Sequence, residues 1–199
     1  MPQFRLASIV KNTLEIKKSQ FITWLVPIES KQHAKTFLEQ ARAEYPDARH
    51  YCWAYLIGEN ENSLSAAMSD DGEPSGTAGK PMLNVLQHKG VYNVMVIVVR
   101  YFGGIKLGAG GLVRAYSQAV EQSFNMATLV EMIPSYDINV ILSFADEQWL
   151  RHQTTKFNGD VLSTNYSDQV QIKLKLPQEH FDTFKQTMDS KQIYCKIIT

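Results

Sequence analysis

Cysteines, long apolar runs and net charge are all scarce in this chain of 199 residues. The two cysteines, Cys52 and Cys195, lie far apart in the sequence, which excludes a disulfide framework and a thiolate-only metal site. The longest apolar run, Val94 to Val99, is too short to cross a bilayer, and the start at Met1 lacks the apolar core of a signal peptide. We therefore expect a cytoplasmic protein with no membrane contact, in a reducing compartment.

Net charge is absent because 20 basic residues balance 20 acidic ones. This balance excludes a histone-like protein that holds nucleic acid by bulk charge alone. The charges are nevertheless segregated, since residues 50–79 contain five acids and no lysine or arginine. Residues 74–120 show the reverse, with no acid and five basic residues: Lys80, Lys89, Arg100, Lys106 and Arg114. A solvated surface explains such runs as readily as a binding site does.

The composition that remains is that of a globular protein, with 44% hydrophobic residues, and it excludes collagen-like, coiled-coil and disordered classes. Residues 1–134 have the pattern of one domain. The pattern predicts a hairpin turning at 17–19, a helix that Ser30 can cap, strands over 49–57, 64–69 and 92–100, and a hairpin tip at 58–60. Further helices are expected to begin at Pro81 and to span 112–125.

Residues 135–199 form a second predicted domain with the order β-α-β-β-α-β, in which Ser143 can cap the first helix. That order specifies a ferredoxin-like sandwich with both helices on one face of an antiparallel sheet, so the expected class is α+β. By alternation, the helix-free face should present Gln171, Lys173, Lys175, Tyr194 and Lys196. This polar platform suits a solvated face, an interdomain contact or a binding surface.

The first glycine-rich segment (residues 69–81, SDDGEPSGTAGKP) combines carboxylates, hydroxyls and glycines before an expected helix start. Its backbone N–H groups could bind an anion while its carboxylates face a cation or a base edge. It is not a Walker A loop, because Pro74 and Pro81 occupy the positions of the first glycine and of the Ser or Thr. A structural turn, an anion or nucleic-acid site and a catalytic or metal site all remain open. The candidate residues are Ser75, Thr77, Gly79 and Lys80, with Asp70, Asp71, Glu73 and His50 as possible polar or base contacts.

The second glycine-rich segment (residues 100–114, RYFGGIKLGAGGLVR) joins an apolar strand to a helix start without any nearby acid. This arrangement favours phosphate contact, although the glycines could instead allow close helix–sheet packing. The dinucleotide fingerprint is absent, because Val113 stands where the third glycine would be. We expect the two segments to converge in space. The anion-binding candidates here are Arg100, Gly103, Gly104, Lys106, Gly108, Gly110, Gly111 and Arg114.

The strand over 49–57 places His50 and Cys52 on one face, and three aromatic residues, Tyr51, Trp53 and Tyr55, on the other. A Cys–His nucleophile pair lacks an identifiable third partner. The aromatic row could stack on bases if it were exposed, but burial is favoured. The other histidines have no ligand spacing, so no metal and no cofactor is expected.

Both glycine-rich segments resemble the hallmark of the YigZ/IMPACT family, with the second match extending to Tyr116 as RYFGGIKLGAGGLVRAY. The resemblance covers residues 1–134, and the remainder resembles the ferredoxin-like extension of the bacterial members. It implies a ribosomal-protein-S5-domain-2-like fold for the first domain. It also implies similarity of the two domains to the fourth and fifth domains of elongation factor G.

Eukaryotic relatives are linked by this resemblance to the control of translation through partner proteins. Two hypotheses follow. The chain is either a non-catalytic binding protein for RNA, the ribosome or a translation factor, or an enzyme for a phosphorylated or nucleotide substrate. In the enzyme hypothesis, Asp70, Asp71 or Glu73 acts as base or metal ligand. The absence of an assembled nucleophile, base and orienting group favours the first hypothesis.

Overall fold

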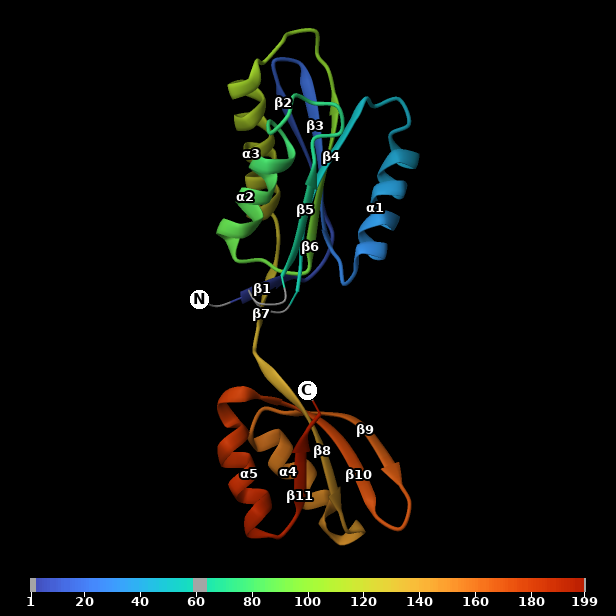
Figure 1. Ribbon diagram of the computed structural model, residues 1–199, viewed down its shortest axis with the longest axis vertical. Coiled ribbons are helices and arrows are strands. Elements are labelled where there is room, and N and C mark those ends of the chain that lie inside the picture. Colours follow the sequence, from blue (N-terminus) through green and yellow to red (C-terminus); the bar gives the residue numbers. More distant parts are fainter. Residues whose placement is uncertain (1–2, 59–63, 199) are drawn as a thin grey trace. The chain divides into compact units, whose positions relative to one another are not determined.

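The computed structural model describes residues 3–58 and 64–198, and the chain divides into two compact units, Met1–Met132 and Ile133–Thr199 (Figure 1). Both units combine helices with antiparallel sheets, which confirms the expected α+β class. Of the hairpin tip expected at 58–60, residues 59 and 60 lie outside the described residues.

The N-terminal unit contains a five-stranded antiparallel sheet in the order β2-β3-β6-β4-β5. Its strands are β2 (Val10–Ile16), β3 (Ser19–Pro27), β4 (His50–Ile57), β5 (Ser65–Ser69) and β6 (Val94–Tyr101). The predicted hairpin is the β2–β3 pair. A separate two-stranded sheet pairs β1 (Gln3–Leu6) with β7 (Leu129–Met132). The sequence pattern did not indicate β7, because a four-residue strand carries too little alternation to be recognised.

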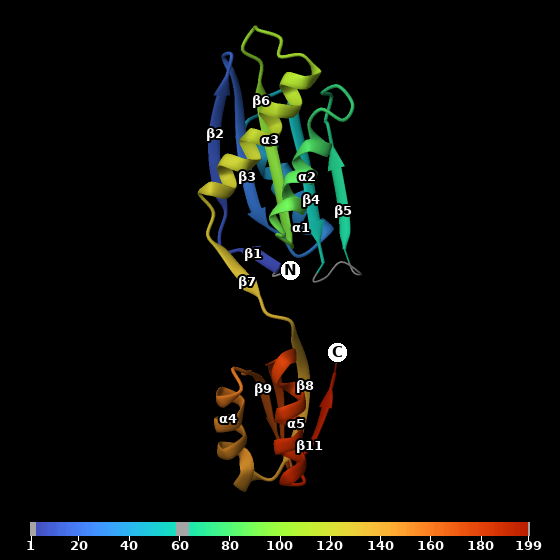
Figure 2. The same ribbon diagram turned by 90° about the vertical axis from the view of Figure 1, so that its left-hand side faces the viewer.

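Helices cover both faces of the large sheet (Figures 1 and 2). Helix α1 (Lys31–Glu44) packs on one face, while α2 (Gly79–Lys89) and α3 (Ala109–Asn125) pack on the other. Ser30 caps α1 as expected, with its hydroxyl accepting a hydrogen bond from the His33 amide at 3.1 Å. Both α2 and α3 begin before the expected positions, so Pro81 lies in the first turn of α2 and is not its first residue.

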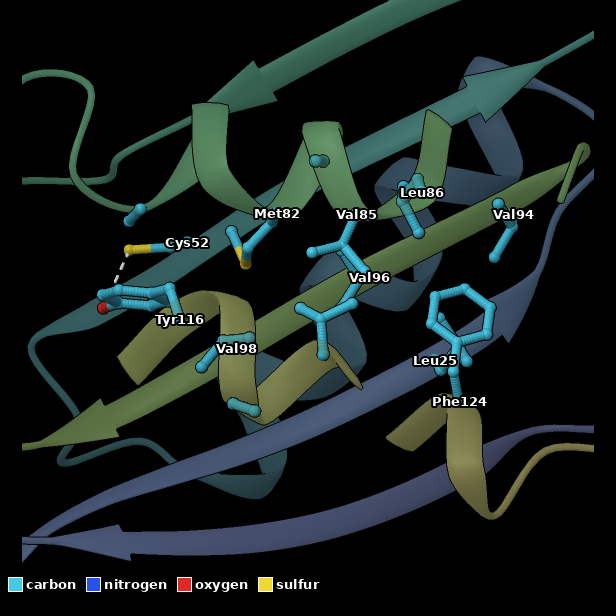
Figure 3. Packing of buried hydrophobic residues seen from close by; sticks show 14 of the residues in the cluster. Leu25, Cys52, Met82, Val85, Leu86, Val94, Val96, Val98, Tyr116 and Phe124 are labelled. Carbon is cyan, nitrogen blue, oxygen red and sulfur yellow. Dashed lines mark hydrogen bonds between the residues drawn. The ribbon is translucent and has the colours of Figure 1, made fainter. Parts of the chain in front are cut away.

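This double cover explains why the central strand β6 is buried on both faces from Val94 to Arg100. The cluster beneath α2 and α3 includes Cys52, Met82, Val96 and Tyr116 (Figure 3). The aromatic row of β4 packs under α1 instead, where Trp53 stacks on Tyr55 with ring centroids 5.6 Å apart. Tyr51 and Tyr55 are buried as expected, and Trp53 is partly buried against them.

The C-terminal unit follows the predicted order, with its four-stranded sheet arranged β11-β8-β10-β9. Its elements are β8 (Ser135–Leu142), a 3₁₀ turn (Phe144–Asp146), α4 (Glu147–Lys156), β9 (Asp160–Tyr166), β10 (Val170–Pro177), a second 3₁₀ turn (Gln178–His180), α5 (Phe181–Ser190) and β11 (Tyr194–Ile197). Ser143 precedes the 3₁₀ turn and does not cap α4 as expected. The strand order and the two helices give the ferredoxin-like arrangement.

Candidate functional site

Both glycine-rich segments leave the same end of the five-stranded sheet. His50 at the start of β4 lies opposite Arg100 near the end of β6, and Ser69 at the end of β5 lies opposite Trp53. The β2–β3 turn belongs to this end too, because Gln20 pairs with Tyr101. Figure 2 shows the loops before α2 and α3 at that end. The first segment approaches both flanks of the second, through contacts to Arg100 and Tyr116.

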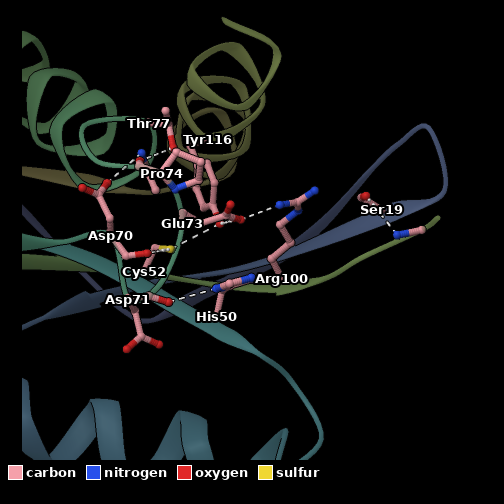
Figure 4. Close-up of polar contacts among 12 residues, drawn as sticks. Ser19, His50, Cys52, Asp70, Asp71, Glu73, Pro74, Thr77, Arg100 and Tyr116 are labelled. Atoms are coloured by element: carbon pink, nitrogen blue, oxygen red, sulfur yellow. Dashed lines mark hydrogen bonds and ion pairs between the residues drawn. The ribbon is translucent and has the colours of Figure 1, made fainter. Parts of the chain in front are cut away.

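The carboxylate of Asp70 organises the first glycine-rich segment (Figure 4). It accepts hydrogen bonds from three backbone amides: Gly76 at 2.8 Å, Ala78 at 2.9 Å and Gly79 at 2.8 Å. Partial burial acts to raise the pKa of Asp70, but these amide donors outweigh it and hold the pKa below its ordinary value. The Ala78 and Gly79 amides at the start of α2 are therefore occupied by the chain's own carboxylate.

A second carboxylate of the first segment, Glu73, is buried in an ion pair. Its Oε1 accepts hydrogen bonds from Arg100 Nη1 at 2.5 Å and from the Tyr116 hydroxyl at 2.9 Å (Figure 4). The side chains of Arg100 and Glu73 are only 7% and 4% exposed. Arg100 was expected among the phosphate-binding cations, but its charge is neutralised inside the protein. Its role here is to hold the two segments together.

Cys52 is buried and belongs to the same network. Its thiol donates to the Asp70 carbonyl at 2.9 Å and lies 3.3 Å from the Tyr116 hydroxyl. Burial raises the pKa of the Cys52 thiol to about 12, so it remains protonated at neutral pH. His50 Nδ1 lies 2.9 Å from the Asp71 carbonyl and forms no pair with Cys52.

The remaining polar side chains of the first segment are also engaged, with two exceptions. Asp71 accepts hydrogen bonds from the Tyr51 amide at 2.7 Å and from Arg42 at 3.2 Å. The buried Thr77 hydroxyl donates to the Pro74 carbonyl at 2.6 Å. Among this segment's candidate residues, Ser75 and Lys80 are exposed. Most polar side chains of the first segment are thus hydrogen-bonded within the protein.

The second glycine-rich segment is attached to the β2–β3 turn by Gly103. Its amide donates to the Ser19 hydroxyl at 3.1 Å, and a Cβ added to Gly103 would lie 2.0 Å from the Lys18 carbonyl carbon. Only glycine allows that approach. Gly104 and Gly108 have φ values of 87° and 71°, which L side chains rarely adopt. Packing and backbone conformation therefore require three of these glycines.

The start of α3 differs from that of α2, because among the described residues no carboxylate bonds its first amides as Asp70 bonds those of Ala78 and Gly79. The first turn contains Ala109, Gly110 and Gly111, and a Cβ on Gly110 would approach nothing closer than Arg114 at 3.8 Å. Lys106 and Arg114 flank this helix start and are exposed. Within the described part of the chain, neither forms an ion pair. This helix start combines unoccupied donors with positive charge.

Sequence reasoning missed the two lysines of the β2–β3 turn. Lys17 and Lys18 are exposed and have φ values of 49° and 64°, although asparagine and glycine are preferred in such two-residue turns. Non-glycine residues in this region cost of order 1 kcal/mol or more each. The backbone of Lys18 lies against Gly103, so the turn that carries these two lysines adjoins the second segment. The clue in the sequence was that lysines stand at 17–18, where a hairpin turn usually has asparagine or glycine.

Residues 3–58 and 64–198 contain neither a metal-binding cluster nor a membrane-spanning helix. No cluster of three or more His, Cys, Asp or Glu side chains is arranged to hold a metal ion there. Nor does that part of the chain contain a helix with the length and apolarity needed to span a membrane.

Comparisons with known proteins agree with this two-unit organisation. The Impact N-terminal domain family matches residues 17–124, and a domain of unknown function, DUF1949, matches residues 140–191. The IMPACT family member YigZ of Escherichia coli is 40% identical over 163 residues, which cover 82% of this chain and 80% of that protein.

Protein IMPACT of Xenopus laevis is 36% identical over 99 residues, or 48% of this chain and 31% of that protein. A crystal structure described as that of a hypothetical protein is 35% identical, with a TM-score of 0.73 over 100% of this chain and 98% of the other. The Impact match over more than half of the chain and the identity to YigZ over most of both proteins show that the chain belongs to the IMPACT family.

Proposed function

We propose that this chain is a non-catalytic, translation-linked binding protein that contacts RNA phosphates through one end of its N-terminal unit. The contact surface is the basic rim, defined as Lys17, Lys18, Lys106, Arg114 and the start of α3. The observation that carries the proposal is the uncapped start of α3, flanked by exposed Lys106 and Arg114.

The electrostatics of this helix start suit a phosphate group. Its first amides point out of the helix and carry a partial positive charge, to which the helix dipole adds. Lys106 and Arg114 contribute full charges, and no acid lies between residues 74 and 120 to offset them. Phosphate contacts of this kind supply most of the sequence-independent affinity for nucleic acid.

The state of the first segment's carboxylates supports binding over catalysis. Asp70 is bound to backbone amides, Glu73 to Arg100 and Tyr116, and Asp71 to Tyr51 and Arg42. A general base or metal ligand would first have to give up these partners. The link to translation comes from family membership, because the sequence motifs resemble a family whose eukaryotic members are tied to translational control.

The test is RNA affinity measured across a salt series for wild type, Lys106→Ala and Arg114→Ala. Each lost phosphate contact should flatten the slope of log affinity against log salt by roughly one unit and leave sequence preference unchanged. Lys31→Ala is a matched control, since Lys31 is exposed in the first turn of α1 near the opposite end of the sheet. If both rim variants keep the wild-type slope and affinity, the second segment is purely structural.

A further inference from the structure

A separate polar surface lies on the C-terminal unit, on the face of its sheet opposite α4 and α5. Leu150 of α4 and Phe184 and Met188 of α5 pack against one face, together with apolar residues such as Ile138 and Ile172. Alternate residues of the same strands point to the other face. No part of this unit that the structure describes packs over that face, and Figure 1 shows both helices on the same side of the strands.

The strand register aligns the residues of this face into two cross-strand rows. One row runs across β11, β8, β10 and β9 as Tyr194, Ile141, Gln171 and Asn165. The neighbouring row consists, in the same strand order, of Lys196, Asn139, Lys173 and Ser163. The sequence pattern predicted the members of these rows on β10 and β11. It did not predict Asn139 of β8 or Ser163 and Asn165 of β9. We call these two rows the open face.

The open face is hollowed by a groove of about 450 Å³, within the roughly 300–1,000 Å³ typical of small-ligand sites. Its polar lining comes from six side chains of the two rows: Asn139, Ser163, Asn165, Gln171, Lys173 and Lys196. Three of these are carboxamides, which present a donor and an acceptor side by side. No carboxylate lines the groove.

The chemistry of this lining suits an unpaired nucleobase. Carboxamides can match the donor and acceptor pattern of a base edge, and single-stranded RNA leaves such edges open. Tyr194, at the margin of the rows, is 63% exposed and offers a ring on which a base can stack. Lys173 is paired with Asp137 at 2.8 Å, whereas Lys196 is exposed and forms no ion pair with any described residue.

We propose that the open face binds unpaired bases of single-stranded RNA. This inference rests on the proposed function for the identity of the partner as RNA, but it uses other residues and other chemistry. The basic rim would hold phosphates without regard to base, and the open face would recognise bases. The two sites can therefore be tested separately on the same chain.

The experiment measures, by fluorescence anisotropy, the affinity of the full chain for two labelled 12-mers. One is single-stranded RNA of mixed sequence, and the other has the same backbone but no bases. Wild type should bind the base-bearing oligomer more tightly. Tyr194→Ala should lower that affinity by at least about fivefold and leave the abasic affinity unchanged. Gln171→Glu, which places a carboxylate in the groove at nearly constant volume, should act in the same direction.

Two variants on the helix-covered side serve as matched controls. Tyr166 is 61% exposed but lies opposite the core residue Val170 and bonds to Glu147 of α4, so Tyr166→Ala should leave RNA affinity unchanged. Lys185→Ala removes an exposed charge from α5 and should likewise leave RNA affinity unchanged.

The outcomes separate this inference from the proposed function. Equal wild-type affinity for the two oligomers, or unchanged RNA affinity in both Tyr194→Ala and Gln171→Glu, would overturn base binding at the open face. If these variants lost ribosome co-sedimentation with RNA affinity unchanged, the face would belong to a protein partner, which also overturns the inference. If Lys106→Ala and Arg114→Ala kept the wild-type salt slope, phosphate binding by the basic rim would be contradicted. Base binding at the open face would not be affected by that result.

Discussion

The two glycine-rich segments have similar compositions but opposite relations to their surroundings. In the first, Asp70 occupies the amides at the start of α2, and Glu73 is buried against Arg100 and Tyr116. In the second, no side chain caps α3, and Lys106 and Arg114 are exposed. The first segment bonds the amides at its own helix start, whereas no side chain of the described residues bonds those at the start of α3.

The difference shows that glycine content alone does not identify an anion site at a helix start. Whether the segment contains acids decides whether the amides at its helix start are already hydrogen-bonded. A segment with its own carboxylates can satisfy its own amides, as Asp70 does, because an internal carboxylate is held close to them by the chain. A segment without acids leaves that position open.

Glu73→Ala should cause the largest loss of stability among the variants considered for the two segments. It leaves the Arg100 charge buried without its partner, which costs about 3–5 kcal/mol in unfolding free energy. Urea unfolding measures the loss. The control is Glu39→Ala, which breaks the exposed Lys35–Glu39 pair and should change stability by less than about 0.5 kcal/mol. Equal effects of the two variants would show that the buried pair does not clasp the segments.

Gly103→Ala should have the next largest effect. The new Cβ would overlap the backbone at Lys18, and the expected loss is near the top of the roughly 1–3 kcal/mol range for overpacking. Gly104→Ala faces open space and carries only the strain of its positive φ, about 1 kcal/mol. Thermal unfolding of both variants checks the ranking, and the reverse order would contradict the close approach at Gly103.

Asp70→Asn should cost about 1–2 kcal/mol at neutral pH, because one of the two oxygens that accept backbone amides becomes an NH2 group facing a donor. The folded state holds the pKa of Asp70 below its unfolded value of about 3.9. The stability that this carboxylate contributes is therefore fully present above about pH 5 and is lost as the pH falls through the folded pKa. The difference in unfolding free energy between wild type and variant should shrink from pH 6 to pH 3. A constant difference would show that the Asp70 charge is not what caps α2.

Gly110→Ala should have the smallest effect on stability. It also tests directly whether the start of α3 contacts RNA. The added Cβ meets only the Arg114 side chain, so alanine should stabilise the helix by up to about 1 kcal/mol. The same methyl group stands beside the amides proposed to receive phosphate, and RNA affinity should fall several-fold. A variant with higher stability and unchanged affinity would show that Gly110 is not kept for close approach of a ligand.

The sequence predicted most of the fold, because long alternating or helical patterns reflect burial directly. The β-α-β-β-α-β order and the buried strand β6 are examples. It did not predict β7 or the early starts of α2 and α3. Short strands have little periodicity, and the helix starts contain Gly79 and Gly110, which local propensity assigns to loops.

The candidate site was predicted only as a set of residues, without their partners. The charge of Arg100 was visible in the sequence, but its burial against Glu73 depends on a contact between residues 27 positions apart. The same limit hid the contact of Tyr116 with Glu73 and the approach of the predicted Lys17-Lys18 turn to Gly103. Lys106 and Arg114 were identified because the run without acids in which they lie is visible in the sequence itself, without any tertiary contact. Their role in RNA binding stays a prediction.

The placement of the two cysteines provides the chain with its own reporters of local opening. Cys52 lies in the core of the N-terminal unit with no exposed surface, whereas Cys195 is half-buried on the edge strand β11. A thiol reagent can reach Cys52 only when β4 separates from its covering helices, so its labelling rate reports the free energy of that opening. Cys195 reports on β11 in the same experiment, and the opening of each unit can be followed by mass spectrometry without engineering a new cysteine into the chain.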